Sequence, residues 1–218
     1  MQIAIVGLFW LTLAAAAQAE TYQGRATITD GDTLEVQGVT VRLQGIDAAE
    51  SGQRCVASGR QIVRPGKDAM LRLENLARNG ITCSGTSYDD FGRLIGHCTG
   101  HDGTDINKAL VTEGWAWAFT KYSNDYVAEQ ARAKRAHLGV WAMACEEPWV
   151  FRKKRWEVAG QKAPKGCAIK GNVSENGKVY HLPWNKSYAK TKVDLKRGER
   201  WFCDEKQALA AGWRPARN

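Results

Sequence analysis

Short runs of alternating apolar and polar residues, separated by turn residues, recur between positions 22 and 120. Alternation with a period of two residues is typical of half-buried strands. Candidate strands lie at residues 22–28, 33–36, 39–43, 82–87, 94–98 and 115–120. We predict a hairpin closed by Gln37-Gly38, and a second hairpin whose turn spans residues 88–93.

Three other segments place apolar residues at helical spacing. They are residues 65–79, 105–113 and 124–137. Pro65 suits a first helical turn, and Gly80, Gly114 and Gly139 follow the three segments as stop signals. The order is three strands, a helix, two strands, a helix, a strand and a helix. This order predicts an α+β, mainly β fold, in which helices pack on a small barrel.

The longest apolar run lies at the N-terminus, from Ile3 to Ala17. It is shorter than the ~18 residues expected of a membrane-spanning helix. It ends in Ala17-Gln18-Ala19, which is typical of a signal-peptidase site. We therefore expect residues 1–19 to be a signal peptide and the protein to be exported, periplasmic or secreted. Because no Lys or Arg precedes the run, an uncleaved anchor is the alternative.

Composition is that of a globular protein, with 44% hydrophobic and 25% charged residues, and this excludes disorder as the main state. The net charge of +8 is unevenly distributed. Residues 20–150 contain 14 Lys and Arg against 17 Asp and Glu, whereas residues 151–218 contain 17 against 6. We predict a first domain at residues 20–150, a basic linker at 151–166 and a small basic module at 167–218.

Six cysteines in an exported chain suggest disulfides, and no spacing typical of a zinc site is present. Their positions favour three pairs: Cys83–Cys98 across the second hairpin, Cys55–Cys145, and Cys167–Cys203, which would close the C-terminal module.

Acidic residues cluster around one arginine between positions 30 and 50, in Asp30-Gly31-Asp32-Thr33, Arg42 and Asp47-Ala48-Ala49-Glu50. Two carboxylates at neighbouring strand ends repel each other, and a hard divalent cation such as Ca²⁺ relieves that repulsion. The planar guanidinium of an arginine suits a phosphate. Taken singly, each element has a plainer interpretation, because Asp-Gly is a common turn and a lone arginine often forms a surface ion pair.

Together with Asp89-Asp90-Phe91-Gly92-Arg93, Gly114-Trp115-Ala116-Trp117-Ala118 and Gly139-Val140-Trp141, these motifs resemble the staphylococcal nuclease (thermonuclease) family over about residues 22–149. The resemblance implies a five-stranded OB-fold barrel with three packed helices. It also implies Ca²⁺-dependent hydrolysis of DNA and RNA that leaves 3′-phosphate ends.

The resemblance further implies roles for individual positions. Asp32, Asp47 and the carbonyl of Ala48 match metal ligands. Arg42 and Arg93 match phosphate-binding arginines, and Glu50 matches the residue that positions or deprotonates the attacking water. Lys121 and Tyr122 fall near positions that contact the substrate in the family. The full set of candidate site residues is Asp32, Arg42, Asp47, Ala48, Glu50, Arg93, Lys121 and Tyr122.

Two other classes of protein remain open at this point. One is a non-catalytic module that binds nucleic acid on the same barrel. The other is an envelope protein whose partner, held by the basic C-terminal region, is an anionic exopolysaccharide. We expect a monomer without a membrane span after signal removal.

Overall fold

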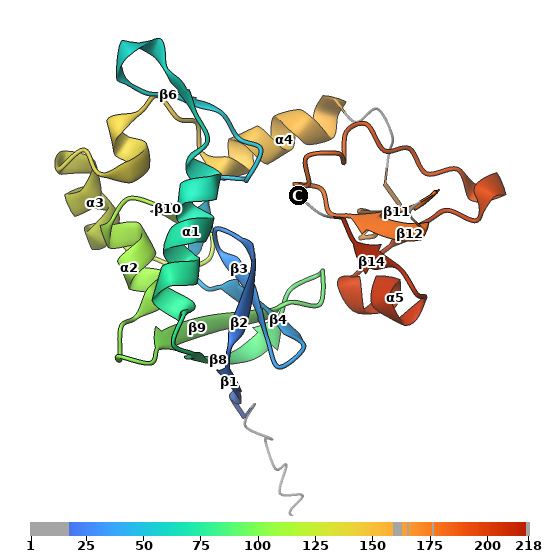
Figure 1. Ribbon diagram of the computed structural model, residues 1–218, viewed down its shortest axis with the longest axis horizontal. Helices are drawn as coiled ribbons and strands as arrows, with labels where there is room; N and C mark the ends of the chain where they lie inside the picture. The colour runs from blue at the N-terminus through green and yellow to red at the C-terminus, as the bar shows by residue number, and fades with distance from the viewer. Residues whose placement is uncertain (1–17, 159–162, 165, 176, 217–218) are drawn as a thin grey trace, which may run out of the picture.

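The computed structural model describes residues 18–158, 163–164, 166–175 and 177–216. The expected signal peptide lies outside these residues except for its last two positions. In the described part of the chain, no helix has the length and apolar character needed to cross a bilayer. Figure 1 shows a barrel-like domain and a smaller C-terminal module, with helix α4 (Pro148–Val158) between them.

A curled six-stranded sheet forms the first domain, in the order β1-β8-β9-β4-β3-β2. Its strands are β1 (Glu20–Gly24), β2 (Ala26–Asp30), β3 (Thr33–Val36), β4 (Val39–Leu43), β8 (Ile81–Tyr88) and β9 (Leu94–Gly100). The β3–β4 hairpin has the predicted bounds, and Gln37 and Gly38 both have positive φ. The predicted strand at residues 22–28 is instead two strands separated by Arg25.

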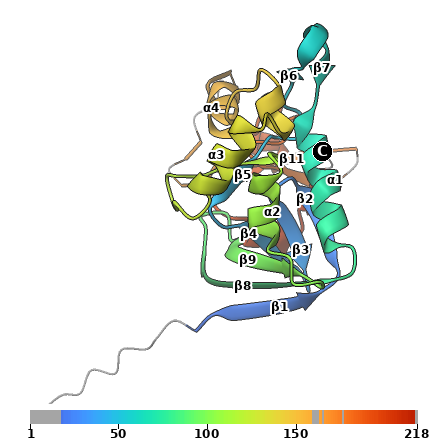
Figure 2. The same ribbon diagram turned by 90° about the vertical axis from the view of Figure 1, so that its left-hand side faces the viewer.

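That division explains the curvature of the sheet. Because β1 and β2 are separated by one residue yet occupy opposite edges, the two edges must come close together. The sheet is therefore a half-barrel of the OB type, and Figure 2 shows it from the side. A separate two-stranded ladder pairs β5 (Ile46–Ala48) with β10 (Ala116–Ala118).

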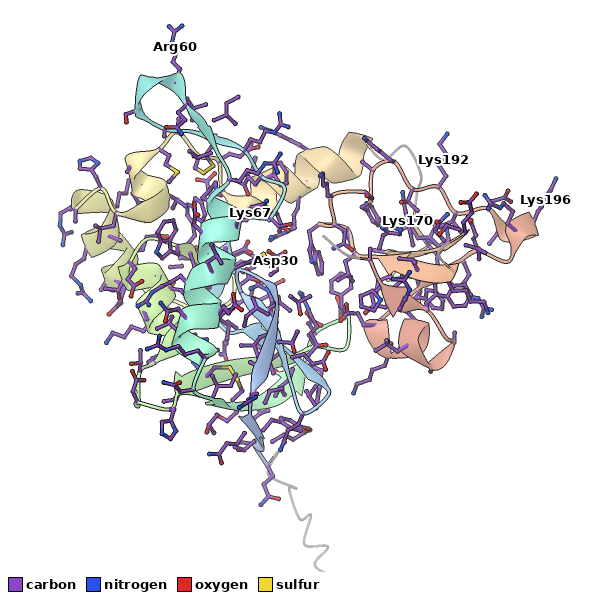
Figure 3. All side chains as sticks on the ribbon, in the orientation of Figure 1. Asp30, Arg60, Lys67, Lys170, Lys192 and Lys196 are labelled. Carbon is purple, nitrogen blue, oxygen red and sulfur yellow. A yellow bond between two sulfur atoms is a disulfide. The ribbon has the colours of Figure 1, made fainter. Side chains whose placement is uncertain are left out.

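Helices α1 (Pro65–Ala77), α2 (Ile106–Thr112) and α3 (Val127–Arg135) are the three that the sequence predicted. Asp105 caps α2 by accepting a hydrogen bond from the Lys108 N–H. Apolar residues of the sheet and of α1 and α2, among them Leu34, Leu73 and Leu110, form the main core. A short hairpin of β6 (Cys55–Val56) and β7 (Ile62–Val63) projects from the domain around the turn η1 (Ser58–Arg60), and η2 (Gly139–Ala142) follows α3. Arg60 marks the tip of this hairpin in Figure 3.

The C-terminal module has its own sheet and core. Its sheet has the order β13-β11-β12-β14. The module comprises β11 (Ile169–Ser174), β12 (Gly177–His181), η3 (Leu195–Arg197), β13 (Arg200–Phe202), α5 (Glu205–Ala210) and β14 (Arg214–Pro215). Ile169, Tyr180, Phe202 and Trp213 are buried together. The Glu205 N–H donates to the Phe91 carbonyl at 2.7 Å, so the module contacts the β8–β9 turn directly.

All three predicted disulfides are confirmed, namely Cys55–Cys145, Cys83–Cys98 and Cys167–Cys203. The expected linker differs from the structure at its start, because residues 151–158 belong to α4. Pro148 at the beginning of this helix has the fixed φ that suits a first turn, and the basic run after it continues the helix rather than ending it.

Candidate active site

A cavity of about 600 Å³ opens where the barrel, α4 and the C-terminal module meet. Of the eight predicted site residues, six line this cavity: Asp32, Arg42, Glu50, Arg93, Lys121 and Tyr122. The other two, Asp47 and Ala48 on β5, are buried next to it. The structure thus brings all the predicted residues into one region.

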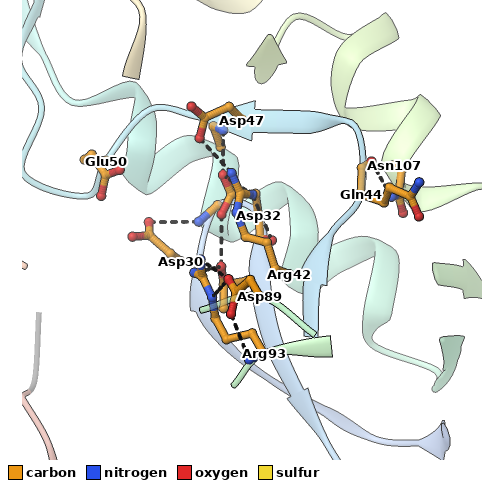
Figure 4. Close-up of polar contacts among 12 residues, drawn as sticks. Asp30, Asp32, Arg42, Gln44, Asp47, Glu50, Asp89, Arg93 and Asn107 are labelled. Carbon is orange, nitrogen blue, oxygen red and sulfur yellow. Dashed lines mark hydrogen bonds and ion pairs between the residues drawn. The ribbon is translucent and has the colours of Figure 1, made fainter. Parts of the chain in front are cut away.

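Arg42 joins two of the predicted carboxylates, as Figure 4 shows. Its Nη1 lies 2.6 Å from Asp32 Oδ2, and its Nη2 lies 2.8 Å from Asp47 Oδ1. The fold dictates this contact, because Thr33 pairs with Arg42 in the β3–β4 ladder and Asp32 precedes Thr33. The Ala48 N–H donates to Asp32 Oδ2 at 2.7 Å. Burial opposes ionisation of Asp32, but the Arg42 charge and this hydrogen bond outweigh it and lower the pKa.

Glu50 lies in a loop that is tied to a distant part of the chain. Its N–H donates to Gln53 Oε1 at 3.2 Å, and Gln53 Nε2 donates to the Glu146 carbonyl at 2.7 Å. The Cys55–Cys145 disulfide joins the same two segments a few residues further on. The loop that carries the candidate water-activating carboxylate is therefore cross-linked at two points.

Arg93 is held at the start of β9 by the turn before it. Asp89 Oδ2 accepts from Arg93 Nε at 2.8 Å and lies 2.7 Å from Nη2. The ring of Trp184, from the C-terminal module, lies 4.5 Å from the guanidinium carbon, and the Phe91 ring lies 5.5 Å from it. A carboxylate and two aromatic rings thus fix this guanidinium beside the cavity.

A third arginine, Arg152 of α4, completes the charged cluster. Its Nη2 lies 2.7 Å from Asp47 Oδ2, and its Nη1 donates to Asp47 Oδ1 at 3.0 Å and to Glu50 Oε1 at 2.7 Å. Ion pairing with these two carboxylates raises the pKa of the Arg152 guanidinium against the effect of burial. This residue falls within the predicted linker, and its role in the site was not predicted.

Asp30, at the end of β2, is a second residue that the sequence analysis left without a role. It lines the cavity together with Glu50. Burial and the nearby Asp32 charge raise the pKa of Asp30 to about 7. Burial, followed by the Asp30 charge, also raises the pKa of Glu50 well above its usual value. A raised pKa makes a carboxylate a stronger base when it is ionised.

The donor chemistry of this region suits Ca²⁺, although its present contacts are with arginines. Carboxylate oxygens from Asp32, Asp47 and Glu50 are hard ligands, and Glu50 Oε2 is buried without a hydrogen-bond partner. Within the described residues, however, no three acidic, His or Cys side chains are grouped as a metal site. Asp47 and Glu50 instead contact guanidinium groups.

Aromatic side chains form the rim beside the predicted substrate contacts. Tyr122 is 69% exposed, its ring meets Phe119 edge to face at 5.0 Å, and Lys121 Nζ lies 5.1 Å from it. Phe119 also stacks on Trp149 of α4 at 5.3 Å. Exposed rings beside cationic groups are typical of surfaces on which nucleic acid bases stack.

The sequence carries an indication of some, but not all, of the site residues that were not predicted. Trp149 and Arg152 are three residues apart after Pro148, a spacing that puts both on one face of a helix. The dense positive charge of residues 152–155 hid that pattern and favoured a linker. Trp184 had no such signal, because only the folded C-terminal module brings it to Arg93.

Comparisons with known proteins agree with this geometry. A family model described as staphylococcal nuclease homologue matches residues 40–143, and one described as ArfC matches residues 156–215. The chain is 33% identical over 143 residues to the succinoglycan biosynthesis protein ExoI of Rhizobium meliloti (strain 1021), covering 64% of this chain and 75% of that protein. It is 31% identical over 78 residues to uncharacterized endonucleases of Escherichia coli O157:H7 and Escherichia coli, covering 34% of this chain and 51% of each of them.

The half-barrel of the OB type and its arginine–carboxylate cavity, together with the endonuclease relatives, support a nuclease. More specifically, the chain belongs to the staphylococcal nuclease family.

Proposed function

We propose that this protein is an exported, Ca²⁺-dependent nuclease that hydrolyses DNA and RNA with little sequence preference. The main support is the juxtaposition of Arg42, Arg93 and Glu50 around one cavity. Three disulfides favour an oxidising compartment. The basic composition of residues 151–218 favours a polyanionic substrate.

In this proposal, Arg42 and Arg93 bind the scissile phosphate and stabilise the negative charge that develops on its oxygens. Glu50 accepts a proton from the water that attacks phosphorus. The bond from phosphorus to the 5′-oxygen then breaks, the leaving oxygen takes a proton from solvent, and a 3′-phosphate remains. Asp32, Asp47 and the Ala48 carbonyl would hold Ca²⁺, which when bound supplies Lewis-acid stabilisation to the phosphate.

Cleavage of single-stranded DNA by the oxidised mature protein tests the proposal, with Ca²⁺ in one arm and a chelator in the other. We expect Ca²⁺-dependent cutting, and a fall in kcat of about 10²-fold or more in Glu50→Gln and in Arg93→Ala. Arg78→Ala, an exposed change outside the cavity, is the control and keeps full activity. Well-folded protein that binds DNA but cuts nothing with Ca²⁺ would favour the non-catalytic alternative.

A second candidate function is binding of an anionic exopolysaccharide. It is favoured by the similarity to ExoI, whose name places that protein in succinoglycan biosynthesis, and by the basic C-terminal region. Competition between a fluorescent oligonucleotide and an acidic polysaccharide tests it. Displacement of the oligonucleotide at low polysaccharide concentration would support this candidate, and no displacement would remove it.

A further inference from the structure

Arg152 contacts both oxygens of Asp47, the most deeply buried of the candidate metal-binding carboxylates, which lies next to the cavity. Asp47 is fully buried. Its Oδ2 is contacted by Arg152 Nη2, and its Oδ1 is contacted by both Arg42 Nη2 and Arg152 Nη1. The same guanidinium reaches Glu50 Oε1 at 2.7 Å. Of the four carboxylate oxygens of Asp47 and Glu50, three are therefore engaged by guanidinium groups, and Glu50 Oε2 is left without a partner.

The two arginines on Asp47 differ in how they are anchored. Arg42 comes from β4 in the middle of the sheet, and its side chain is 11% exposed. Arg152 comes from α4, outside the sheet, and its side chain is 22% exposed and lines the cavity. A change of side-chain rotamer or a shift of α4 would release Arg152 without breaking a strand pairing. Arg152 is thus the removable member of the pair.

We propose that Arg152 is a built-in counter-ion of the active site, which competes with a divalent cation for Asp47 and Glu50. Without a cation, its charge compensates Glu50, which would otherwise be buried without an ion-pair partner, and it shares Asp47 with Arg42. A divalent cation bound to the same oxygens would repel the guanidinium and take its place. The inference rests on the proposed function and concerns control of that same site.

Because Arg152 lies on α4, its release would also affect the parts of the molecule that α4 contacts or approaches, including the C-terminal module. This helix runs from Pro148 towards that module, and Trp149, one turn before Arg152, stacks on Phe119. A movement of α4 would therefore change both the aromatic rim and the counter-ion. Binding of metal and the position of α4 are coupled in this scheme.

Calorimetric titration of Ca²⁺ into the oxidised protein tests the proposal directly. We expect Arg152→Gln to lower the Kd for Ca²⁺ at least tenfold, and Arg152→Lys, which keeps one charge without the two-pronged contact, to give an intermediate value. Lys153→Gln is the matched control, because it removes the same charge from an exposed neighbour on the same helix and leaves the Kd unchanged. Ca²⁺ binding seen only in Arg152→Gln would also support the proposal.

Thermal unfolding adds a readout independent of calorimetry. In the absence of Ca²⁺, Arg152→Gln should have a lower Tm than the parent. Addition of Ca²⁺ should raise the Tm of Arg152→Gln by more than it raises the Tm of the parent. If Arg152→Gln does not fold, Arg152→Lys answers the same question.

Equal Ca²⁺ affinity in Arg152→Gln and Lys153→Gln would overturn the inference. So would a raised KM for DNA with unchanged Ca²⁺ affinity, because Arg152 would then be a phosphate ligand. In both cases Ca²⁺-dependent cutting by the parent would leave the proposed function standing. Absence of both Ca²⁺ binding and cutting in every variant would overturn the two together.

Discussion

Asp89 contacts both the backbone and the guanidinium of Arg93. Its Oδ1 accepts from the N–H groups of Phe91 and Arg93, and its Oδ2 pairs with Nε and Nη2 of Arg93. One carboxylate therefore shapes the turn and aims the arginine that follows it. At the scale of single residues, the cavity depends on such positioning groups as much as on the residues that would touch phosphate.

Asp89→Asn should therefore lower kcat for DNA cleavage by about tenfold to a hundredfold, because an amide nitrogen cannot accept a hydrogen bond, so either the turn N–H groups or the guanidinium loses its acceptor. KM should change less, since in the proposed mechanism Arg42 would still bind the phosphate. Asp68→Asn is the control, because Asp68 is exposed and lies outside the cavity. Equal kcat in the two variants would show that Asp89 has no positioning role.

His181 offers a prediction about pH. It is buried, its Nδ1 has no partner, and burial together with the Lys170 charge lowers its pKa. The folded protein therefore keeps this imidazole neutral to a lower pH than the unfolded chain, which takes up a proton below about pH 6.5. Its contribution to stability is thus complete above that pH and is lost as the pH falls through it, by at most ~1.4 kcal/mol per pH unit. Urea unfolding of the parent and of His181→Gln between pH 8 and 5 measures the difference, and parallel pH curves would contradict it.

Elements bounded by strong turn signals matched their predictions. The β3–β4 hairpin was predicted to the residue because Gln37-Gly38 fixes its turn, and α2 was predicted from the cap at Asp105. Elements that depend on pairing between distant parts of the chain were not predicted. Ile46–Ala48 is too short to show a periodicity, so β5 is recognisable only by its pairing with β10. In the site, predicted carboxylates and arginines came from contiguous motifs, whereas Trp184 and Arg152 reach it through tertiary structure.

The start of α1 shows how one element positions another. Gly66 is its second residue, and a Cβ added there would lie 2.2 Å from the Glu50 carbonyl oxygen. Gly66→Ala should push the Glu50 loop away, lower kcat at least tenfold and destabilise the fold by about 1–3 kcal/mol. Gly24→Ala is the control, because its Cβ would meet no atom closer than 3.8 Å. Normal activity in Gly66→Ala would contradict the close packing.

At the scale of the whole molecule, the cavity belongs to three parts at once. The barrel supplies Arg42 and Arg93, α4 supplies Arg152, and the C-terminal module supplies Trp184. Contacts of the module with the β8–β9 turn are both polar and aromatic, since Lys206 Nζ also lies 4.4 Å from the Tyr88 ring. The module is therefore a wall of the candidate site as well as a basic appendage.

Trp184→Ala tests this view of the module. Loss of the ring over Arg93 removes an interaction of about 0.5–2 kcal/mol, so kcat/KM for single-stranded DNA should fall roughly threefold to thirtyfold. Trp201→Ala removes a ring of the same module that lies outside the cavity, and it serves as the control. Equal losses in the two variants would mean that Trp184 acts only through folding of the module.

The order of the cysteines has a consequence for how the molecule is made. Cys55 and Cys145 enclose Cys83 and Cys98 in the sequence, so the first two disulfides are nested. A chain oxidised in the order of its synthesis would join Cys55 to Cys83 first, and that bond must be exchanged before the native pairs can form. When the chain is oxidised as it is translated, a disulfide isomerase should raise the native yield of the parent and add little for Cys55→Ala/Cys145→Ala, which no longer has nested pairs. Equal benefit in both would contradict this. Production of this enzyme thus depends on correction of its cross-links as well as on their formation.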